Sequence, residues 1–249
     1  MTDRLWSGSP TIRPLAESAL LVKMGDAIDP GVVARAAALA KAIEAAALPG
    51  VVDIVPAYTT VLVAFDPVDA EPSALTTAIR RLAADASEAE TVLGQTVTIP
   101  VAYGGMFGPD LDDVAAKLGL PPSEVIARHA AAEYLVACIG FAPGFPYLMG
   151  MPAELATPRL PDPRIRVPSG SVAIGGHQTG IYTMETPGGW RIIGRTPVRL
   201  FDLGQAKPFL LQAGDRVRFR RITEDAFAAI AQERGVEGHV VTTEGASDA

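Results

Sequence analysis

Cysteine and histidine are scarce in this chain of 249 residues. Cys138 is the single cysteine, and the three histidines are His129, His177 and His239. One cysteine cannot form an internal disulfide framework, and so few scattered ligands do not suit a structural zinc site. The histidines also lack the His-x-His and His-Glu-x-x-His spacings of metal sites. We therefore predict no bound transition metal and a reducing, cytoplasmic location.

Positive charge and long apolar runs are lacking as well. The 21 lysines and arginines are outnumbered by 28 acidic residues, and the formal net charge is -7. This balance argues against a phosphate-backbone binder, which needs a clustered basic surface. Residues 110–131 have a helix, glycine turn and helix pattern, but Lys117 and Arg128 are too few for DNA contacts. No apolar run reaches the roughly 18 residues of a membrane-spanning helix, and the N-terminus lacks a signal-peptide pattern. We predict neither a nucleic-acid nor a membrane partner.

Residues 1–90 are predicted to form a small α+β domain. Asp29 can cap the exposed amides of a helix, and Pro30 suits the first helical position. Ser73 is predicted to cap a second helix that ends near Ala86. β-Branched runs predict strands at residues 11–15, 18–24, 51–57 and 60–65. The resulting order is ββαββα, with both helices on one face of the sheet.

Residues 95–223 are predicted to form a mainly β domain, which follows a polar linker at residues 87–94. An alternating strand at 96–101 precedes two short helices, at 110–118 and 122–132. Beyond Tyr134, proline and glycine separate short strands as far as Arg220, a pattern typical of a closed barrel. Residues 224–249 are predicted to be a C-terminal extension that is partly disordered, because its end is small and polar.

The stretch from Gly140 to Asp202 combines glycine and proline with aromatic, hydroxyl, amide and guanidinium side chains. Proline removes an amide donor and glycine adds backbone entropy, so this stretch cannot be a long helix. It predicts short strands and tight turns around a concave binding face. Its motifs are Gly140-Phe141-Ala142-Pro143-Gly144-Phe145-Pro146-Tyr147-Leu148, Arg164-Ile165-Arg166-Val167-Pro168-Ser169-Gly170-Ser171, Gly175-Gly176-His177-Gln178-Thr179-Gly180-Ile181-Tyr182, Pro187-Gly188-Gly189-Trp190, Ile193-Gly194-Arg195-Thr196-Pro197 and Leu200-Phe201-Asp202.

These motifs resemble the family formed by the B subunits of bacterial 5-oxoprolinase, also called allophanate hydrolase subunit 1. The family includes a sporulation histidine-kinase inhibitor and is similar to one half of the carboxyltransferase region of urea carboxylase. The resemblance implies that the barrel is cyclophilin-like. It covers roughly residues 10–222 and includes Pro100-Val101-Ala102-Tyr103-Gly104-Gly105, Gly108-Pro109-Asp110-Leu111, His129 and Glu133-Tyr134.

The resemblance also implies a function. The chain would be one subunit of an ATP-dependent 5-oxoprolinase complex, which hydrolyses 5-oxo-L-proline to L-glutamate with ATP and Mg bound by the complex. Its partners would be a homologous C subunit, which completes a composite site, and a third polypeptide, the A subunit. Two alternatives stay open: a subunit that hydrolyses allophanate or another urea derivative, and a non-catalytic inhibitor of a sensor histidine kinase. Activity of the isolated chain stays open too.

Three residues are candidate catalytic groups. His129 could be a general base, because an unperturbed histidine titrates near neutrality, although a lone histidine on an alanine-rich helix can equally be structural. Arg195 could stabilise developing phosphoryl charge, and Gln178 could orient the substrate amide. A Ser-His-Asp triad is disfavoured, because no helix follows the serines as a nucleophile elbow requires. That triad would draw on Ser169, Ser171, His177 and Asp202.

A second group of residues is predicted to bind substrate or nucleotide. Arg164 and Arg166 could make bidentate contacts with a carboxylate or phosphate, or could simply face solvent. Residues 175–180 could present backbone amides as an anion nest, or could form a tight strand turn. Ser169 and Thr179 could orient the substrate. The aromatic residues are predicted to wall a flat ligand or a subunit interface, with barrel core as the alternative; they are Phe141, Phe145, Tyr147, Tyr182 and Trp190.

Overall fold

The computed structural model describes residues 10–88 and 94–232. The chain divides into two compact units, Met1–Leu93 and Gly94–Ala249, and each unit has its own buried core. Most of the predicted linker lies outside the described residues. No helix in the described ranges is long and apolar enough to cross a membrane.

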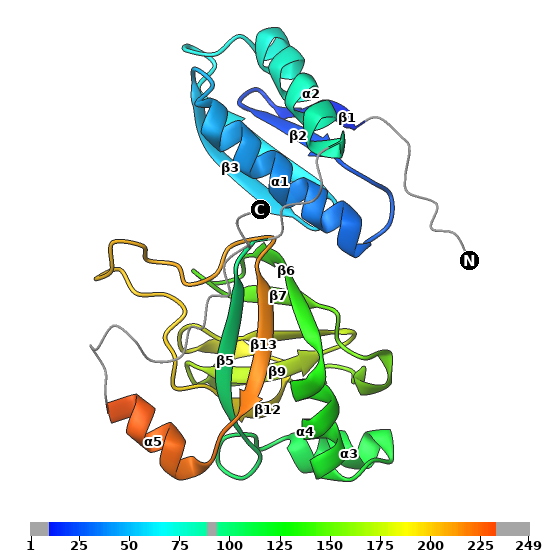
Figure 1. Ribbon diagram of the computed structural model, residues 1–249, viewed down its shortest axis with the longest axis vertical. Coiled ribbons are helices and arrows are strands. Elements are labelled where there is room, and N and C mark those ends of the chain that lie inside the picture. The colour runs from blue at the N-terminus through cyan, green and yellow to red at the C-terminus, as the bar shows by residue number, and fades with distance from the viewer. Residues whose placement is uncertain (1–9, 89–93, 233–249) are drawn as a thin grey trace, which may run out of the picture. The chain divides into compact units, whose positions relative to one another are not determined.

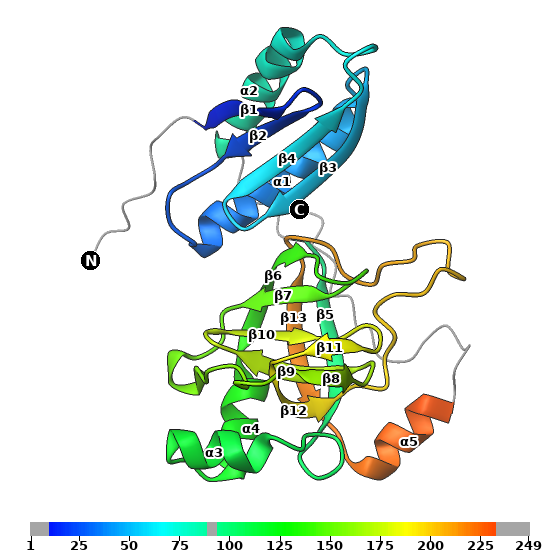
Figure 2. The ribbon, with the colours of Figure 1, turned by 180° about the vertical axis from the view of Figure 1, so that it is seen from behind.

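Residues 10–88 contain four strands and two helices in the order β1, β2, α1, β3, β4, α2 (Figure 1). The strands are antiparallel, and their order in this unit is β1-β2-β4-β3. Both helices lie on the same face of these strands (Figures 1 and 2). The elements are β1 Thr11–Ala16, β2 Ala19–Lys23, α1 Pro30–Ala46, β3 Val51–Ala57, β4 Thr60–Phe65 and α2 Pro72–Glu88.

The first turns of α1 and α2 are each capped by a nearby carboxylate side chain. The Asp29 carboxylate accepts hydrogen bonds from the amides of Gly31 and Val32, at 2.8 and 3.3 Å, so the predicted cap of α1 is confirmed. The predicted cap of α2 is wrong. Glu71 accepts the Ala74 amide at 2.7 Å, while the Ser73 hydroxyl donates to Glu71. The longer carboxylate side chain reaches the exposed amide from outside the helix, so Ser73 lies within the first turn.

Residues 94–232 contain a closed barrel of seven strands in the order β6-β13-β5-β12-β9-β10-β7, and β7 pairs with β6 to close it. β13 and β5 are parallel, whereas the other neighbouring pairs are antiparallel. The barrel that the proline and glycine pattern predicts is therefore confirmed. Its strands are β5 Thr96–Tyr103, β6 Glu133–Ile139, β7 Pro146–Met149, β9 Ser171–Gly175, β10 Gln178–Ile181, β12 Arg191–Arg195 and β13 Arg216–Arg221.

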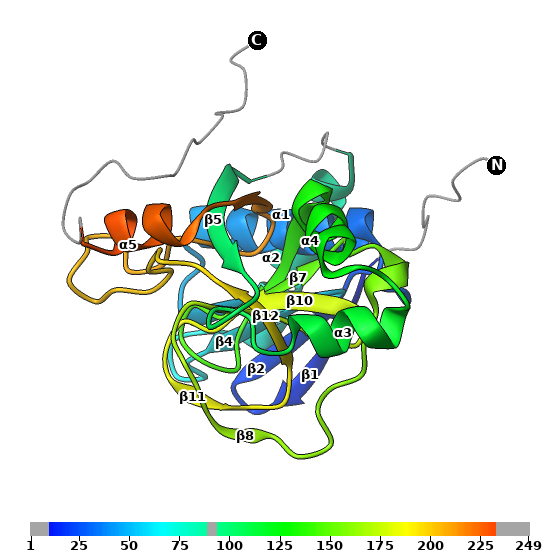
Figure 3. The ribbon, with the colours of Figure 1, turned by 90° about the horizontal axis from the view of Figure 1, so that it is seen from below.

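Short elements surround the barrel. β8 (Arg164–Val167) and β11 (Thr186–Gly188) form a separate two-stranded ribbon (Figure 2). α3 (Leu111–Leu118) and α4 (Pro122–Ala131) lie at one end of the barrel, joined by Gly119 in the left-handed conformation. A short 3₁₀ helix, Ala153–Leu155, contacts α4. Figure 3 shows the α3–α4 pair and α5 on different sides of β5.

The predicted C-terminal extension begins as α5 (Glu224–Gln232). α5 contacts β5, and the ring of Phe227 packs on Phe107 with 4.6 Å between the ring centres. A helix fits residues 224–232 because their apolar side chains can pack in this way. The rest of the predicted extension, from residue 233 onward, lies outside the described residues.

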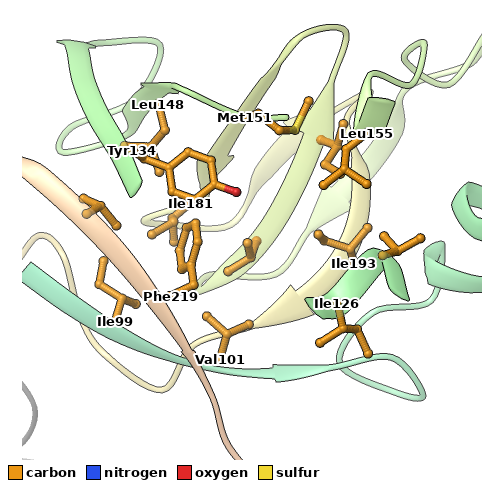
Figure 4. Close-up of a cluster of buried hydrophobic side chains, with 14 of the residues drawn as sticks. Ile99, Val101, Ile126, Tyr134, Leu148, Met151, Leu155, Ile181, Ile193 and Phe219 are labelled. Atoms are coloured by element: carbon orange, nitrogen blue, oxygen red, sulfur yellow. The ribbon is translucent and has the colours of Figure 1, made fainter. Parts of the chain in front are cut away.

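The barrel is filled by alternate side chains of its strands. Val172 and Ile174 of β9 point inward, while Ala173 between them belongs to a cluster on the other side of the wall. This period of two follows from the pleat of a strand. Burying each large apolar side chain contributes about 1.5–3 kcal/mol. Figure 4 shows Leu148, Tyr134, Ile181 and Phe219 converging on this interior from four different strands.

Candidate functional site

Buried aromatic rings form a second cluster outside the barrel wall. The rings of Phe145, Tyr182 and Trp190 meet edge to face, and the ring centres of Phe145 lie 5.2 Å from Tyr182 and 5.7 Å from Trp190. Such pairs add about 0.5–1.5 kcal/mol beyond the area they bury. These three rings are therefore buried, but in a cluster outside the barrel and not in the barrel core that was the alternative interpretation. Tyr147 and Phe141 keep exposed surface.

Glycines in the motifs let these rings lie directly against the backbone. A Cβ added at Gly175 would be 2.5 Å from the Trp190 ring, and one at Gly180 would be 2.9 Å from Phe145. A Cβ at Gly188 would be 2.3 Å from the Tyr182 hydroxyl. The alternation of glycine with aromatic residues is thus a packing requirement of the outer cluster.

His129 lies inside the barrel end, with 0% of its surface exposed. Its Nδ1 is 2.9 Å from the Tyr103 hydroxyl, and its Nε2 is 3.0 Å from Oγ1 of Thr179. Burial lowers the pKa of His129 to about 3, because the charged imidazolium would lose its hydration. Since both ring nitrogens have protein partners and the ring is buried, His129 agrees with the alternative that this histidine has a structural role. A general-base role would require this network to open.

The three arginines predicted to bind anions have different surroundings. Arg164 makes a bidentate pair with the buried Asp110, with nitrogen–oxygen distances of 2.9 and 2.6 Å. Arg166 is exposed and lies 3.5 Å from Glu185. Arg195 donates from Nε to the backbone carbonyl of Ser169 at 2.8 Å. Arg164 is thus neutralised by a carboxylate, whereas Arg195 faces none among the described residues.

The turn in the Gly175–Gly180 motif joins β9 to β10. Gly175 pairs with Gln178, which leaves Gly176 and the exposed His177 at the tip. The Gly176 amide donates to the Thr157 carbonyl at 2.9 Å, and the Thr157 amide donates back at 3.2 Å. The anion-nest interpretation is therefore wrong for Gly176, because this bridge already uses its amide. Half-buried Gln178 begins β10, and Thr179 follows it on the inner face of the barrel.

The serines bind backbone groups. Ser169 donates its hydroxyl to the Thr183 carbonyl at 2.8 Å, and Ser171 donates to the Pro168 carbonyl at 2.7 Å. Asp202 bonds Arg199 and the Gly204 amide. The described contacts join neither serine to a histidine, so the triad that the sequence disfavours has no geometric support.

Arg195 bonds one of three loops that are hydrogen-bonded to one another. Ser169 and Gly170 join the 182–183 segment, since Ser169 donates to Thr183 and the Gly170 amide donates to the Tyr182 carbonyl at 2.6 Å. The Thr183 hydroxyl in turn donates to the Pro143 carbonyl at 2.7 Å. We call the surface formed by Phe141, Pro143, Ser169, Thr183 and Arg195 the Arg195 face. Its residues come from the motifs at 140–148, 164–171 and 193–197, together with Thr183, which directly follows the motif at 175–182.

Sequence reasoning missed Asp110 and Arg191. The Asp110 carboxylate holds Arg164 and also accepts the Ile192 amide at 2.7 Å, so it ties the start of α3 to β8 and β12. Arg191 is buried, donates to the Pro158 carbonyl at 2.8 Å and pairs with Asp113. The Gly108-Pro109-Asp110-Leu111 motif was a signal for Asp110, whereas no local pattern distinguishes Arg191 from a surface arginine. No group of three potential metal ligands occurs within residues 10–88 and 94–232.

Comparison with known proteins agrees with this arrangement. The family described as carboxyltransferase domain, subdomain C and D, matches residues 10–211, which include most of both units and the whole Arg195 face. The chain belongs to this carboxyltransferase family. The family resemblance drawn from the motifs is thereby confirmed.

Relatives in this family match most of the chain. It is 40% identical over 232 residues to the B subunit of 5-oxoprolinase from Bacillus subtilis (strain 168), covering 89% of this chain and 97% of that protein. It is 47% identical over 174 residues to the B subunit of 5-oxoprolinase from Escherichia coli O157:H7, covering 69% and 78%. The crystal structure of TTHA0988 aligns with a TM-score of 0.75 at 37% identity, covering 86% of this chain. The chain spans only 40% of that longer protein.

Proposed function

We propose that this chain is the B subunit of an ATP-dependent 5-oxoprolinase complex, which hydrolyses 5-oxo-L-proline to L-glutamate. The observation that carries the proposal is the match with the Bacillus subtilis protein, which is 40% identical and covered over 97% of its length. A match of that extent includes both units, so it concerns the whole architecture and not a shared module alone.

The Arg195 face supports a binding role for this subunit. It offers a guanidinium, two hydroxyl oxygens and an exposed aromatic ring on a rigid barrel. Sites on such a scaffold are loops positioned by regular structure. We also infer that the barrel is of the cyclophilin-like type and that the protein works in the cytoplasm, since a chain with one cysteine needs no oxidising compartment.

ATP and Mg are proposed for the assembly. A lactam is an unactivated amide, and ATP would supply the free energy and activation that its hydrolysis needs. Two of the groups predicted to hold phosphate on this chain do not fit that role. Arg164 is neutralised by Asp110, and the Gly176 amide is bonded to Thr157. We therefore assign no nucleotide contact to these residues.

The partners proposed are a homologous C subunit, which completes a composite site, and a third polypeptide, the A subunit. The length of TTHA0988 supports a larger functional assembly, because the fold of this chain makes up 40% of that protein. In the proposed assembly, the A and C subunits would supply the remaining content.

The test is reconstitution of this chain with the proposed A and C subunits. We would follow ATP hydrolysis and glutamate formation with and without 5-oxo-L-proline. We expect glutamate that is stoichiometric with 5-oxoproline-dependent ATP hydrolysis and that is lost when this chain is omitted. A well-formed complex without turnover would rule out this substrate, and allophanate hydrolysis and inhibition of a sensor histidine kinase would be assayed next.

A further inference from the structure

Arg195 presents an unused guanidinium edge. Its Nε is held by the Ser169 carbonyl at 2.8 Å, which fixes the orientation of the planar group. Its two terminal nitrogens have no hydrogen-bond or ion-pair partner in the described part of the chain. Arg164 and Arg191, by contrast, are each paired with an aspartate. A half-buried guanidinium with one edge fixed and the other open is pre-organised to bind a carboxylate through two parallel hydrogen bonds.

The two hydroxyl groups of the Arg195 face can only accept hydrogen bonds from a ligand. Ser169 donates its proton to the Thr183 carbonyl, and Thr183 donates its proton to the Pro143 carbonyl. A hydroxyl oxygen keeps two lone pairs after donating its single proton. The face therefore combines cationic donors with neutral acceptors, which suits a ligand that carries both an anionic group and an N–H.

Phe141 adds an exposed aromatic ring to this face, and its backbone has an unfavourable left-handed conformation. It has φ +67°, and 61% of its surface is exposed. A left-handed conformation at a residue with a bulky side chain is unfavourable and persists where the surroundings fix it. Here the Gly140 amide bonds the Phe145 carbonyl, the Phe145 amide bonds the Ala142 carbonyl, and the Phe141 ring rests edge-on against Phe145. An exposed aromatic ring kept in this way is a candidate contact for the apolar body of a ligand.

We propose that the Arg195 face is the subsite for the carboxylate of the lactam substrate. Arg195 binds the carboxylate, an oxygen of Ser169 or Thr183 accepts the ring N–H, and Phe141 packs against the methylene groups of the ring. The inference rests on the proposed function, because a cyclic amide that bears a carboxylate is the ligand with this set of groups. It goes further by assigning the carboxylate to one named arginine out of three.

The experiment compares two ligands that differ only in charge. Dissociation constants of 5-oxo-L-proline and its neutral carboxamide would be measured by calorimetry, with the reconstituted complex and without ATP. We expect the wild-type complex to bind the acid about 10- to 100-fold more tightly, the range of a charged hydrogen-bonded contact. Arg195→Gln should abolish this preference, and Arg195→Lys should keep part of it. Arg199→Gln is the matched control, since Arg199 is exposed and pairs with Asp202, and it should keep the full preference.

A second variant separates the wall from the anion site. Phe141→Ala should weaken binding of the acid and of the carboxamide by the same factor, because the ring contacts a part common to both. A preference for the acid that survives in Arg195→Gln overturns the proposal, as does equal binding of both ligands by the wild-type complex.

The outcomes also separate this inference from the proposed function. Arg195-dependent preference for the acid, without glutamate formation, would retain the subsite and reject the oxoprolinase assignment. Glutamate formation with an acid preference that is independent of Arg195 would retain the function and reject the subsite. Absence of binding by the wild-type complex rejects the subsite directly.

Discussion

The Tyr103 hydroxyl and the Nδ1 atom of His129 lie 2.9 Å apart in the interior of the barrel. The direction of this hydrogen bond follows from the other end of the network. The single hydroxyl proton of Thr179 goes to the Ala173 carbonyl at 3.0 Å, so Oγ1 can only accept from Nε2–H of His129. Nδ1 is then the unprotonated nitrogen and accepts from Tyr103. The network assigns one neutral tautomer to His129 and connects α4 with β5 and β10.

The buried histidine should make stability depend on pH. The pKa of His129 is lowered to about 3 in the folded protein, against 6.5 for an unperturbed histidine, so the unfolded state takes up a proton first as pH falls. The stabilisation is complete above the unfolded pKa and is lost on acidification toward the folded pKa. We expect the free energy of unfolding to fall by about 1.4 kcal/mol per pH unit from this group between roughly pH 6 and 5. Urea denaturation across this range measures the slope. His129→Asn should flatten this pH dependence, whereas the control His177→Gln, at an exposed position, should leave it unchanged. If the free energy of unfolding of His129→Asn fell with pH as steeply as that of the wild type, His129 would not be the source of the slope.

Loss of either partner of His129 should destabilise the barrel. Tyr103→Phe leaves Nδ1 of His129 without a donor, and Thr179→Val leaves Nε2–H of His129 without an acceptor. Each buried unsatisfied group costs about 1–3 kcal/mol, so each variant should lower the free energy of unfolding by about that amount. Denaturation midpoints at constant m-value measure both changes. Thr77→Val is the matched control, because its hydroxyl bonds a helix carbonyl on an exposed surface. If Thr179→Val were as mild as this control, the directed network would be wrong.

Asp110 should be a structural carboxylate. Asp110→Asn removes the charge that faces Arg164 and one acceptor of the bidentate pair, and we expect a loss of about 2–3 kcal/mol in stability. Asp112→Asn, on the exposed side of the same helix turn, should change stability by less than about 0.5 kcal/mol. Thermal or chemical unfolding of the two variants decides this. Equal effects at positions 110 and 112 would show that the buried pair contributes nothing specific.

Glycine at position 180 should be required for packing. Gly180→Ala would place a methyl group 2.9 Å from both the Phe145 ring and the Pro146 carbonyl, and overpacking of this kind costs about 1–3 kcal/mol. Gly140→Ala is the control, since a methyl group added there would meet nothing within 4 Å and its φ is ordinary. A lower melting temperature for the 180 variant alone is expected. If the melting temperature of Gly180→Ala were unchanged, the outer aromatic cluster could accommodate the methyl group without loss of stability.

Local chemistry predicted much of the fold. The Asp29-Pro30 start of α1 is correct because a capping carboxylate acts within three residues of the amides that it binds. The start of α2 is misassigned for a related reason: Glu71 and Ser73 both lie close enough to bond the helix amides, and propensity favours the shorter side chain. The barrel could be predicted from turn residues and from the alternation of large and small side chains along strands. In β9, the large Val172 and Ile174 point into the barrel, and the small Ala173 between them points outward.

The candidate site was only partly predictable. Arg164, Arg166 and Arg195 look alike in the sequence, because each is an arginine in a β-rich stretch with glycine nearby. The partner of Arg164 lies 54 residues earlier, and Arg191 and Asp113 are 78 residues apart. Such pairs form only when the barrel closes, so no window of the sequence contains both members. The same holds for Tyr103, which meets His129 across 26 residues and two helices.

The sequence by itself determined the family, the strand and turn pattern and the motifs that line one region of the barrel. These depend on side-chain size, alternation and backbone permissiveness, which act over a few residues. Only the tertiary structure decided which polar side chains have partners within the protein and which can bind a ligand. Asp110 neutralises Arg164 and the barrel end encloses His129, whereas Arg195 keeps one guanidinium edge for a ligand. Electrostatic pairing and desolvation depend on neighbours in space, and those are set by closure of the barrel.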